Sequence, residues 1–250
     1  MNVILTIIHI FGLVTMGFSG LMTTCLLTSL IADDGASTAF FDGSLITFLF
    51  GLLMFLPTLS IPKKVSRQAG FLLVSMTWSL SPVFCALPLL LYFPELSFID
   101  AYFETTSGLT TTGATILSSI DALPMSINLW RHELNWIAGM GIIIFAVAIL
   151  PILGIGGMQL YKAETPGSVK ESDLPPRIAQ TAKALWFVYA GFSVVCIIAL
   201  RLAGMDWFDA ICHAFAAMSL GGFSTHDSSV GFFNSVSIEV VLSIFQLLAA

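Results

Sequence analysis

One stretch decides the fold of this chain: DAYFETTSGLTTTGAT, residues Asp100 to Thr115. It is too apolar for an exposed loop and too short to cross a bilayer, which takes about 20 helical residues. Up to about Leu109 it suits a short helix, with Asp100 as candidate N-cap and Glu104 near the positive end of the helix dipole. From Leu109 to Thr115 the threonines and Gly113 favour extended backbone with free carbonyls. The stretch therefore predicts a re-entrant pore helix and its filter, because such backbone at membrane depth must be buried in protein or line a wet cavity.

The pattern occurs a second time, at a constant offset of 109 residues. Phe98 to Ala101, FIDA, is echoed by Trp207 to Ala210, WFDA. Gly113 follows its aspartate by 13 residues, and Gly222 follows Asp209 by the same 13. A TTTG run alone is typical of a turn, but its repetition favours two copies of one pore unit. Rings of backbone carbonyls that replace a hydration shell select potassium in channels, so the repeat predicts a cation pathway.

Composition places the chain in a membrane. Hydrophobic residues make up 57% and charged residues 10%, and the mean hydropathy is +0.95, which is far from soluble proteins. The first apolar run has no basic n-region and no cleavage site, so we expect a retained helix. The cysteines show no metal-ligand spacing and are expected to be packing residues: Cys25, Cys85, Cys196 and Cys212.

The charges set the topology. Seven of the nine basic residues fall in two segments, namely Lys63, Lys64 and Arg67, and then Lys162, Lys170, Arg177 and Lys183. By the positive-inside rule both segments are cytoplasmic. The other connections are acidic, so the outer face is expected to attract cations. The acidic residues concerned are Asp33, Asp34, Asp42, Glu95, Asp100, Glu104, Asp121, Asp206, Asp209 and Asp227.

We expect an all-α integral membrane protein with potassium-channel-like repeats of helix, re-entrant pore helix, filter and helix, preceded by two extra transmembrane helices. The apolar helices are expected at about 3–31, 44–61, 70–92, 125–153, 181–203 and 236–250, with the third kinked at Pro82 and Pro88. The pore helices are expected at about 100–109 and 206–218, with filters at 109–115 and 219–225. The domains are a helix pair at 1–62, a first pore repeat at 63–157 and a second at 158–250 that is cut short in its last helix.

Five sequence segments carry a family resemblance. They are LTTTGAT around Gly113, GGFSTHD around Gly222, WIAGMGI at 136–142, AVAILPILGIGGMQLYKAE at 146–164 and PRIAQTAKALW at 176–186. Together they make the chain similar to the first half of TrkH-type potassium uptake proteins of the Trk/Ktr/HKT superfamily. One departure is Ala138, where many relatives have glycine.

The resemblance implies potassium transport through a carbonyl-lined filter in the bacterial inner membrane. It also implies four repeats around one pore, a homodimer, and a cytosolic nucleotide-binding regulatory subunit of TrkA type. The transported ion is potassium, and no organic cofactor, nucleic acid or catalytic residue is expected. By position, the first filter strand is Thr111, Thr112, Gly113 and Ala114, and the second is Gly221, Gly222, Phe223 and Ser224. Potassium would contact the carbonyls of Thr111, Thr112, Gly113, Gly221, Gly222 and Phe223.

Alternative interpretations remain. One is a tandem two-repeat potassium channel that assembles as a dimer. A more remote one is an intramembrane hydrolase, which needs paired catalytic groups inside the bilayer. Arg131, His132 and Glu133 could touch ions, but such a cluster more often anchors a helix at the membrane interface. Both segments of basic residues could dock the regulatory subunit or could serve topology alone.

Overall fold

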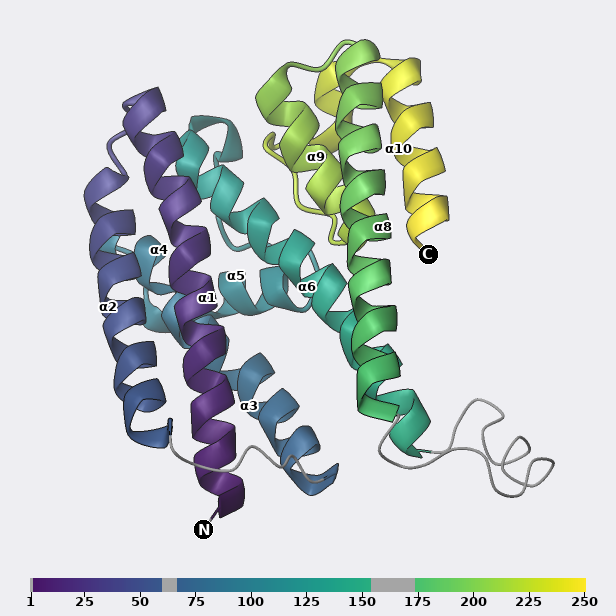
Figure 1. The fold of residues 1–250 in the computed structure, drawn as a ribbon. Coiled ribbons are helices and arrows are strands. Elements are labelled where there is room, and N and C mark those ends of the chain that lie inside the picture. Colours follow the sequence, from purple (N-terminus) through teal and green to yellow (C-terminus); the bar gives the residue numbers. More distant parts are fainter. Residues whose placement is uncertain (1, 60–66, 154–173) are drawn as a thin grey trace, which may run out of the picture.

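A computed structural model describes residues 2–59, 67–153 and 174–250 of the chain, and all regular secondary structure in these ranges is helical (Figure 1). The α-helices are α1 (Asn2–Ala32), α2 (Ser37–Phe55), α3 (Arg67–Cys85), α4 (Leu87–Tyr92), α5 (Phe98–Leu109), α6 (Met125–Leu153), α8 (Leu174–Leu202), α9 (Trp207–Ser219) and α10 (Val236–Ala249). Short 3₁₀ turns cover Leu56–Thr58, Ile120–Ala122 and Ser229–Phe233.

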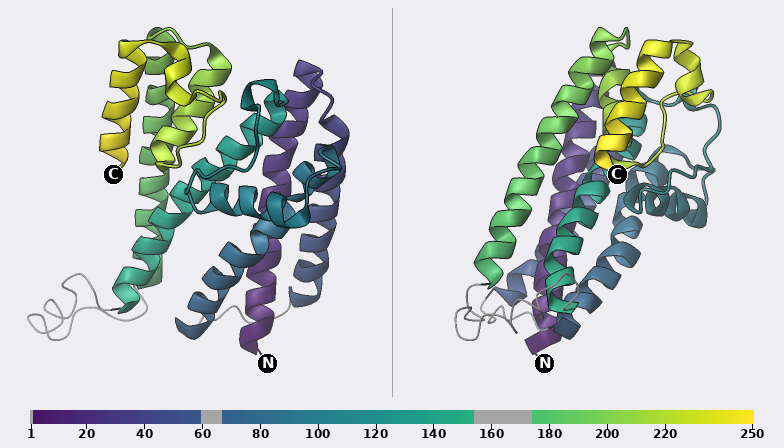
Figure 2. Two further views of the ribbon diagram at one scale, coloured as in Figure 1. Left: turned by 180° about the vertical axis from the view of Figure 1, so that it is seen from behind. Right: turned by 90° about the vertical axis from the view of Figure 1, so that its right-hand side faces the viewer.

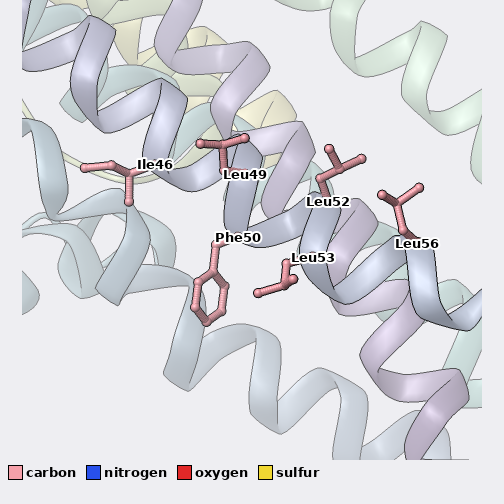
Figure 3. Close-up of a pocket in the computed structure, with 6 residues that line it drawn as sticks. All are labelled: Ile46, Leu49, Phe50, Leu52, Leu53 and Leu56. Atoms are coloured by element: carbon pink, nitrogen blue, oxygen red, sulfur yellow. The ribbon is translucent and has the colours of Figure 1, made fainter.

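Four described segments are long and apolar enough to cross a membrane: Ile4–Ala32, Ser37–Thr58, Gly70–Tyr92 and Gln180–Leu202. The apolar surface is clearest on α2 and the 3₁₀ turn after it, where mostly exposed side chains line a groove and all the lining residues are apolar (Figure 3). Its lining residues are Ile46, Leu49, Phe50, Leu52, Leu53 and Leu56. A helix surface of this kind is stable against hydrocarbon and costly against water.

Helix α6 is the centre of the arrangement. It packs against α1, α5, α8 and α9, and thereby joins the two flanks of the molecule. The α1–α2 pair forms one flank, α8 and α10 form the other, and the short α5 lies nearly crosswise to α1 (Figures 1 and 2). The two re-entrant helices, α5 and α9, both contact α6. One helix of the first repeat therefore supports the pore region of both repeats.

The helix ends that flank the two basic segments lie at the same end of the bundle. The start of α3, the end of α6 and the start of α8 are all at the lower end in Figure 1. This agrees with the topology that the positive-inside rule requires. Lys63, Lys64, Lys162 and Lys170 themselves lie outside the described residues.

Several expected boundaries are confirmed, and the starts of α2 and α8 differ most from the expectation. The helices expected at 125–153 and 236–250 correspond to α6 and α10. Helix α2 begins at Ser37, seven residues earlier than expected, because Asp34 accepts the backbone N–H of Ala36 at 3.2 Å and completes the turn within a short link. Helix α8 begins at Leu174, also earlier than expected. In sequence, Pro175 and Pro176 favour a loop. Proline also suits the first turn of a helix, however, because its missing N–H is not needed there.

The third helix is interrupted at one residue, Ala86, between the two prolines at which we expect a kink, and Ala86 itself keeps helical backbone angles. Pro82 lies inside α3, and the chain restarts as α4 after Ala86, with Pro88 in its first turn. Proline cannot donate a backbone hydrogen bond, so carbonyls near it need other donors. The Pro82 carbonyl accepts the Ala86 N–H at 2.9 Å and, in addition, the Thr105 hydroxyl at 3.1 Å, whereas the Cys85 carbonyl accepts Trp130 Nε1 at 3.0 Å. The break is therefore stabilised by side chains of α5 and α6.

Trp130→Phe tests this dependence. The variant keeps most of the buried ring but leaves the Cys85 carbonyl without its indole donor, so we expect a loss of about 1–2 kcal/mol in stability. The measurement is the apparent Tm of the purified protein in detergent. Trp186→Phe is the matched control, because Trp186 is 38% exposed and should tolerate the change. Equal Tm values for the two variants would contradict the role given to Trp130.

Candidate ion filter

Helices α5 and α9 begin with the same capping geometry. Ser97 caps α5, since its side chain accepts the backbone N–H of Asp100 at 3.1 Å. Asp206 caps α9 and accepts the N–H of Asp209 at 2.7 Å. The expectation that Asp100 is the N-cap is wrong by three residues. Asp100 is instead the acidic partner of a capping pair, and its carboxylate accepts the Ser97 hydroxyl at 2.7 Å.

Both helices also end in the same way, in a turn of the Schellman type. After α5, Thr112 N donates to Ser107 O at 2.9 Å, and Thr111 has φ +52°. After α9, Gly221 N donates to Ala216 O at 2.9 Å, and Leu220 has φ +57°. The expected extended backbone therefore starts later than Leu109, because the turn first satisfies the last carbonyls of the helix.

The first glycine of interest, Gly113, lies where the two segments meet. Gly113 has φ +74°, and a Cβ built on it would lie 2.0 Å from the carbonyl oxygen of Gly221. A side chain at Gly221 would collide with the Asn135 amide at 2.3 Å. Gly222 has φ +75°, but a Cβ there would meet no atom within 4 Å. Space requires glycine at 113 and 221, whereas at 222 the backbone angle alone favours it.

The two segments line one cavity together with residues of α6 and the loops after each segment. Its lining is Gly113, Thr115, Leu117, Ile120, Arg131, Gly222, Phe223, Ser224, His226, Asp227 and Ser229. Of the predicted filter residues, the structure therefore brings Gly113, Gly222, Phe223 and Ser224 around one space. The backbone and polar side chains that face it suit a cation more than an apolar ligand.

A buried ion pair lies beside this cavity. Arg131 Nε is 2.8 Å from Glu104 Oε1, and the two side chains are only 2% and 1% exposed. Glu104 also accepts from Thr115 Oγ1 at 2.9 Å and from the backbone N–H of Ile116 at 3.0 Å. The expectation that Glu104 belongs to the acidic outer face is therefore wrong, because a fully paired carboxylate faces inward.

The interpretation of Arg131, His132 and Glu133 as an interface anchor is also wrong, since all three side chains are buried. Arg131 turns toward the cavity. Glu133 turns the other way, where it accepts the Thr24 hydroxyl of α1 at 2.6 Å. His132 Nδ1 is 2.7 Å from the Asn128 carbonyl within α6. One turn of α6 therefore sends polar groups to different neighbours instead of to the membrane surface.

An outer latch joins the loops that follow the two segments; we use this name for Asp121, Asp209, His226 and Asp227. His226 hydrogen-bonds through Nδ1 to Asp121 and through Nε2 to Asp209 at 3.1 Å. Asp227 accepts the backbone N–H of Ile120 at 3.0 Å. The His226 ring stacks on Phe232 with centroids 3.5 Å apart. The latch links the loops of the two repeats, and two of its residues, His226 and Asp227, line the cavity.

Comparisons with known proteins agree with the fold. A family model described as TrkH, cation transport protein, matches residues 36–250. The chain belongs to this TrkH family. It is an integral membrane protein of all-α fold, as the sequence predicts.

Relatives of the TrkH family match nearly the whole chain. The Trk system potassium uptake protein TrkH of Halomonas elongata is 49% identical over 245 residues, which are 98% of this chain and 51% of that protein. The protein of the same name from Escherichia coli K12 is 47% identical over 97% of this chain and 50% of its own length. The crystal structure of the potassium transporter TrkH from Vibrio parahaemolyticus has a TM-score of 0.86 at 41% identity, over 98% of this chain and 49% of that one. The chain spans about half the length of these relatives.

In this TrkH-family chain, the sequence predicted the two glycine segments but not the side-chain pairs that support them. Nothing in the local pattern pairs Glu104 with Arg131, or His213 with the Ser224 hydroxyl 3.1 Å away. One signal was present: Arg131 is a basic residue in an apolar helix, away from both basic segments. Ionisable residues inside membrane helices generally mark functional sites.

The latch makes stability depend on pH in a defined direction. Partial burial lowers the pKa of His226, but the hydrogen bonds that its ring donates to Asp121 and Asp209 outweigh this effect and hold the pKa above the ordinary value. The hydrogen bond from His226 in turn lowers the pKa of Asp121. The histidine contribution is complete below about pH 6.5 and is lost as the pH rises through the raised pKa. The aspartate contribution is present above about pH 4 and is lost as the pH falls.

We therefore expect the apparent Tm in detergent to be higher at about pH 6 than at about pH 9. His226→Gln should remove most of this difference, because glutamine has no charge to lose. Asp121→Asn should reduce it partly, since Asp209 still faces the ring. An unchanged pH difference in His226→Gln would show that other groups cause it.

Proposed function

We propose that the chain supplies two of the filter segments of a potassium uptake pathway. The observation that carries this proposal is the contact of two glycine-centred segments, each at the C-terminal end of a short re-entrant helix. The C-terminal end of a helix carries partial negative charge, so both helices favour a cation in the cavity between the segments. The names of the relatives support potassium as that cation.

In this proposal the selective groups are backbone carbonyls of the predicted filter residues, Thr111, Thr112, Gly113, Ala114, Gly221, Gly222, Phe223 and Ser224. They exchange for the hydration shell of potassium without covalent chemistry, so the protein is a transporter and not an enzyme. The filters belong to pore repeats at 63–157 and 158–250, preceded by the helix pair at 1–62. The proposed assembly is a homodimer with a cytosolic nucleotide-binding subunit of TrkA type, docked at the basic segments.

The direct test is ion flux in proteoliposomes that contain the full-length protein of which this chain is part. We expect rubidium tracer uptake that unlabelled potassium competes away far better than sodium does. Liposomes without protein are the control for leak. Uptake that sodium and potassium compete for equally would contradict a potassium filter. Residues 1–250 reconstituted alone provide a second arm, since selective flux from them would favour the tandem-channel alternative.

Gly113→Ala and Gly222→Ala form a matched pair for the filter itself. Both glycines have nearly the same positive φ, so the backbone strain of about 1 kcal/mol is common to both variants. Only at Gly113 does the new methyl group collide with the opposite segment. We expect Gly113→Ala to lower the potassium to sodium uptake ratio much more than Gly222→Ala does, measured at matched membrane abundance. Equal ratios would mean that the contact at Gly113 does not shape the selective site.

A further inference from the structure

Arg131 contacts both candidate filter segments from one position on α6. Its Nη2 donates to Thr115 Oγ1 of the first segment at 3.2 Å. Its Nη1 donates to the backbone carbonyl of Ser224 in the second segment at 3.3 Å. The guanidinium carbon also lies 4.4 Å from the ring centroid of Phe223. Among the described residues, Arg131 is the side chain that donates hydrogen bonds to both segments.

The charge of this guanidinium is balanced where it lies. A buried cation is costly unless it is paired and hydrogen-bonded. Glu104 provides both the opposite charge and a hydrogen-bond acceptor, with Oε1 at 2.8 Å from Arg131 Nε. Asn128 Oδ1 accepts a further hydrogen bond from Nη1 at 3.1 Å. Because the pair is neutral as a whole, it can sit beside a cation pathway without repelling the ion strongly. Arg131 therefore acts on the two segments through the fixed positions of its hydrogen-bond donors more than through its charge.

The second repeat has no equivalent of this group. Helix α6 begins at Met125 and α10 at Val236, an offset of 111 residues, which places Leu242 at the position of Arg131, and Leu242 is buried and apolar. At the position of Glu104 the 109-residue offset of the pore helices places His213, whose Nε2 is 3.1 Å from the Ser224 hydroxyl. The second segment thus receives side-chain contacts from His213 and Asp209 of its own helix α9, at Ser224 and Thr225, and a further contact from Arg131 of the first repeat. Arg131 therefore ties the second segment to the first without a counterpart in the second repeat.

We propose that Arg131 is a positioning residue that fixes the spacing of the two filter segments and so sets the discrimination of potassium from smaller monovalent cations. This inference rests on the proposed function. Discrimination by carbonyls depends on how many of them reach the ion and how they are spaced. The planar guanidinium holds Glu104, Thr115 and Ser224 at fixed angles through separate nitrogens. A lysine ammonium is a flexible point charge and cannot reproduce this fork.

Arg131→Lys in the full-length protein is the first test. It keeps the charge opposite Glu104 and removes the fork, so we expect the potassium to sodium uptake ratio in proteoliposomes to fall about tenfold. Arg201→Lys is the matched control. Arg201 donates to the Met205 carbonyl at 3.1 Å and lies 5.6 Å from the Trp207 ring, away from the filter segments. Its ratio should equal that of the wild type.

The double variant Glu104→Gln with Arg131→Met is the second test, which applies even if the Arg131→Lys protein does not fold. Removing both charges avoids leaving one unpaired in the interior, and such replacements are often tolerated. We expect the same fall in the ratio, with rubidium uptake retained. The apparent Tm of every variant is measured in parallel, because a merely structural role would lower Tm and leave the ratio unchanged.

The outcomes separate this inference from the proposed function. A wild-type protein without potassium preference would overturn both. A selective wild type with an unchanged ratio in Arg131→Lys and in the double variant would overturn only the role of Arg131. A fall in the ratio for these variants but not for Arg201→Lys supports it.

Discussion

Backbone that leaves a helix inside a membrane must find hydrogen-bond partners within the protein, and this constraint governs the pore region. The turns after α5 and α9 first return the N–H groups of Thr112 and Gly221 to their own helices. Further along, the Ile116 N–H is accepted by Glu104, and the Ser224 carbonyl receives Arg131. The carbonyls that remain free can then face the cavity. The buried charged groups Glu104 and Arg131 therefore serve as hydrogen-bond partners of the irregular backbone.

The constraint also explains why α6 is both a membrane helix and a polar scaffold. It contacts α5 and α9 at once, so side chains on it can serve either repeat. Asn135 illustrates the closeness: it is fully buried, and its amide occupies the space that a side chain at Gly221 would need. The candidate filter segments therefore pack against α6 as well as against their own short helices, α5 and α9. An internal repeat in sequence does not produce two equal halves in structure.

Length, hydropathy and the internal repeat were sufficient to predict the membrane class, α6, α10 and the position of both pore helices. The turn conformation at Thr111 and Leu220 was not predictable from residue preferences, because both are residues that normally avoid positive φ. The pairing of Glu104 with Arg131 was missed for another reason. Its partners are 27 residues apart, and only the folded chain brings α5 and α6 together. Local patterns specify helices well and contacts between them poorly.

The broken third helix has a consequence for biogenesis. A membrane protein is synthesised from its N-terminus, so α3 and α4 leave the ribosome before Trp130 does. The Pro82 carbonyl already accepts the Ala86 N–H at 2.9 Å, whereas the Cys85 carbonyl accepts a side chain that follows it by 45 residues, Trp130. Until then another donor, such as water, must satisfy the Cys85 carbonyl. The interruption at Ala86 therefore ties the final packing of the third helix to the arrival of α6.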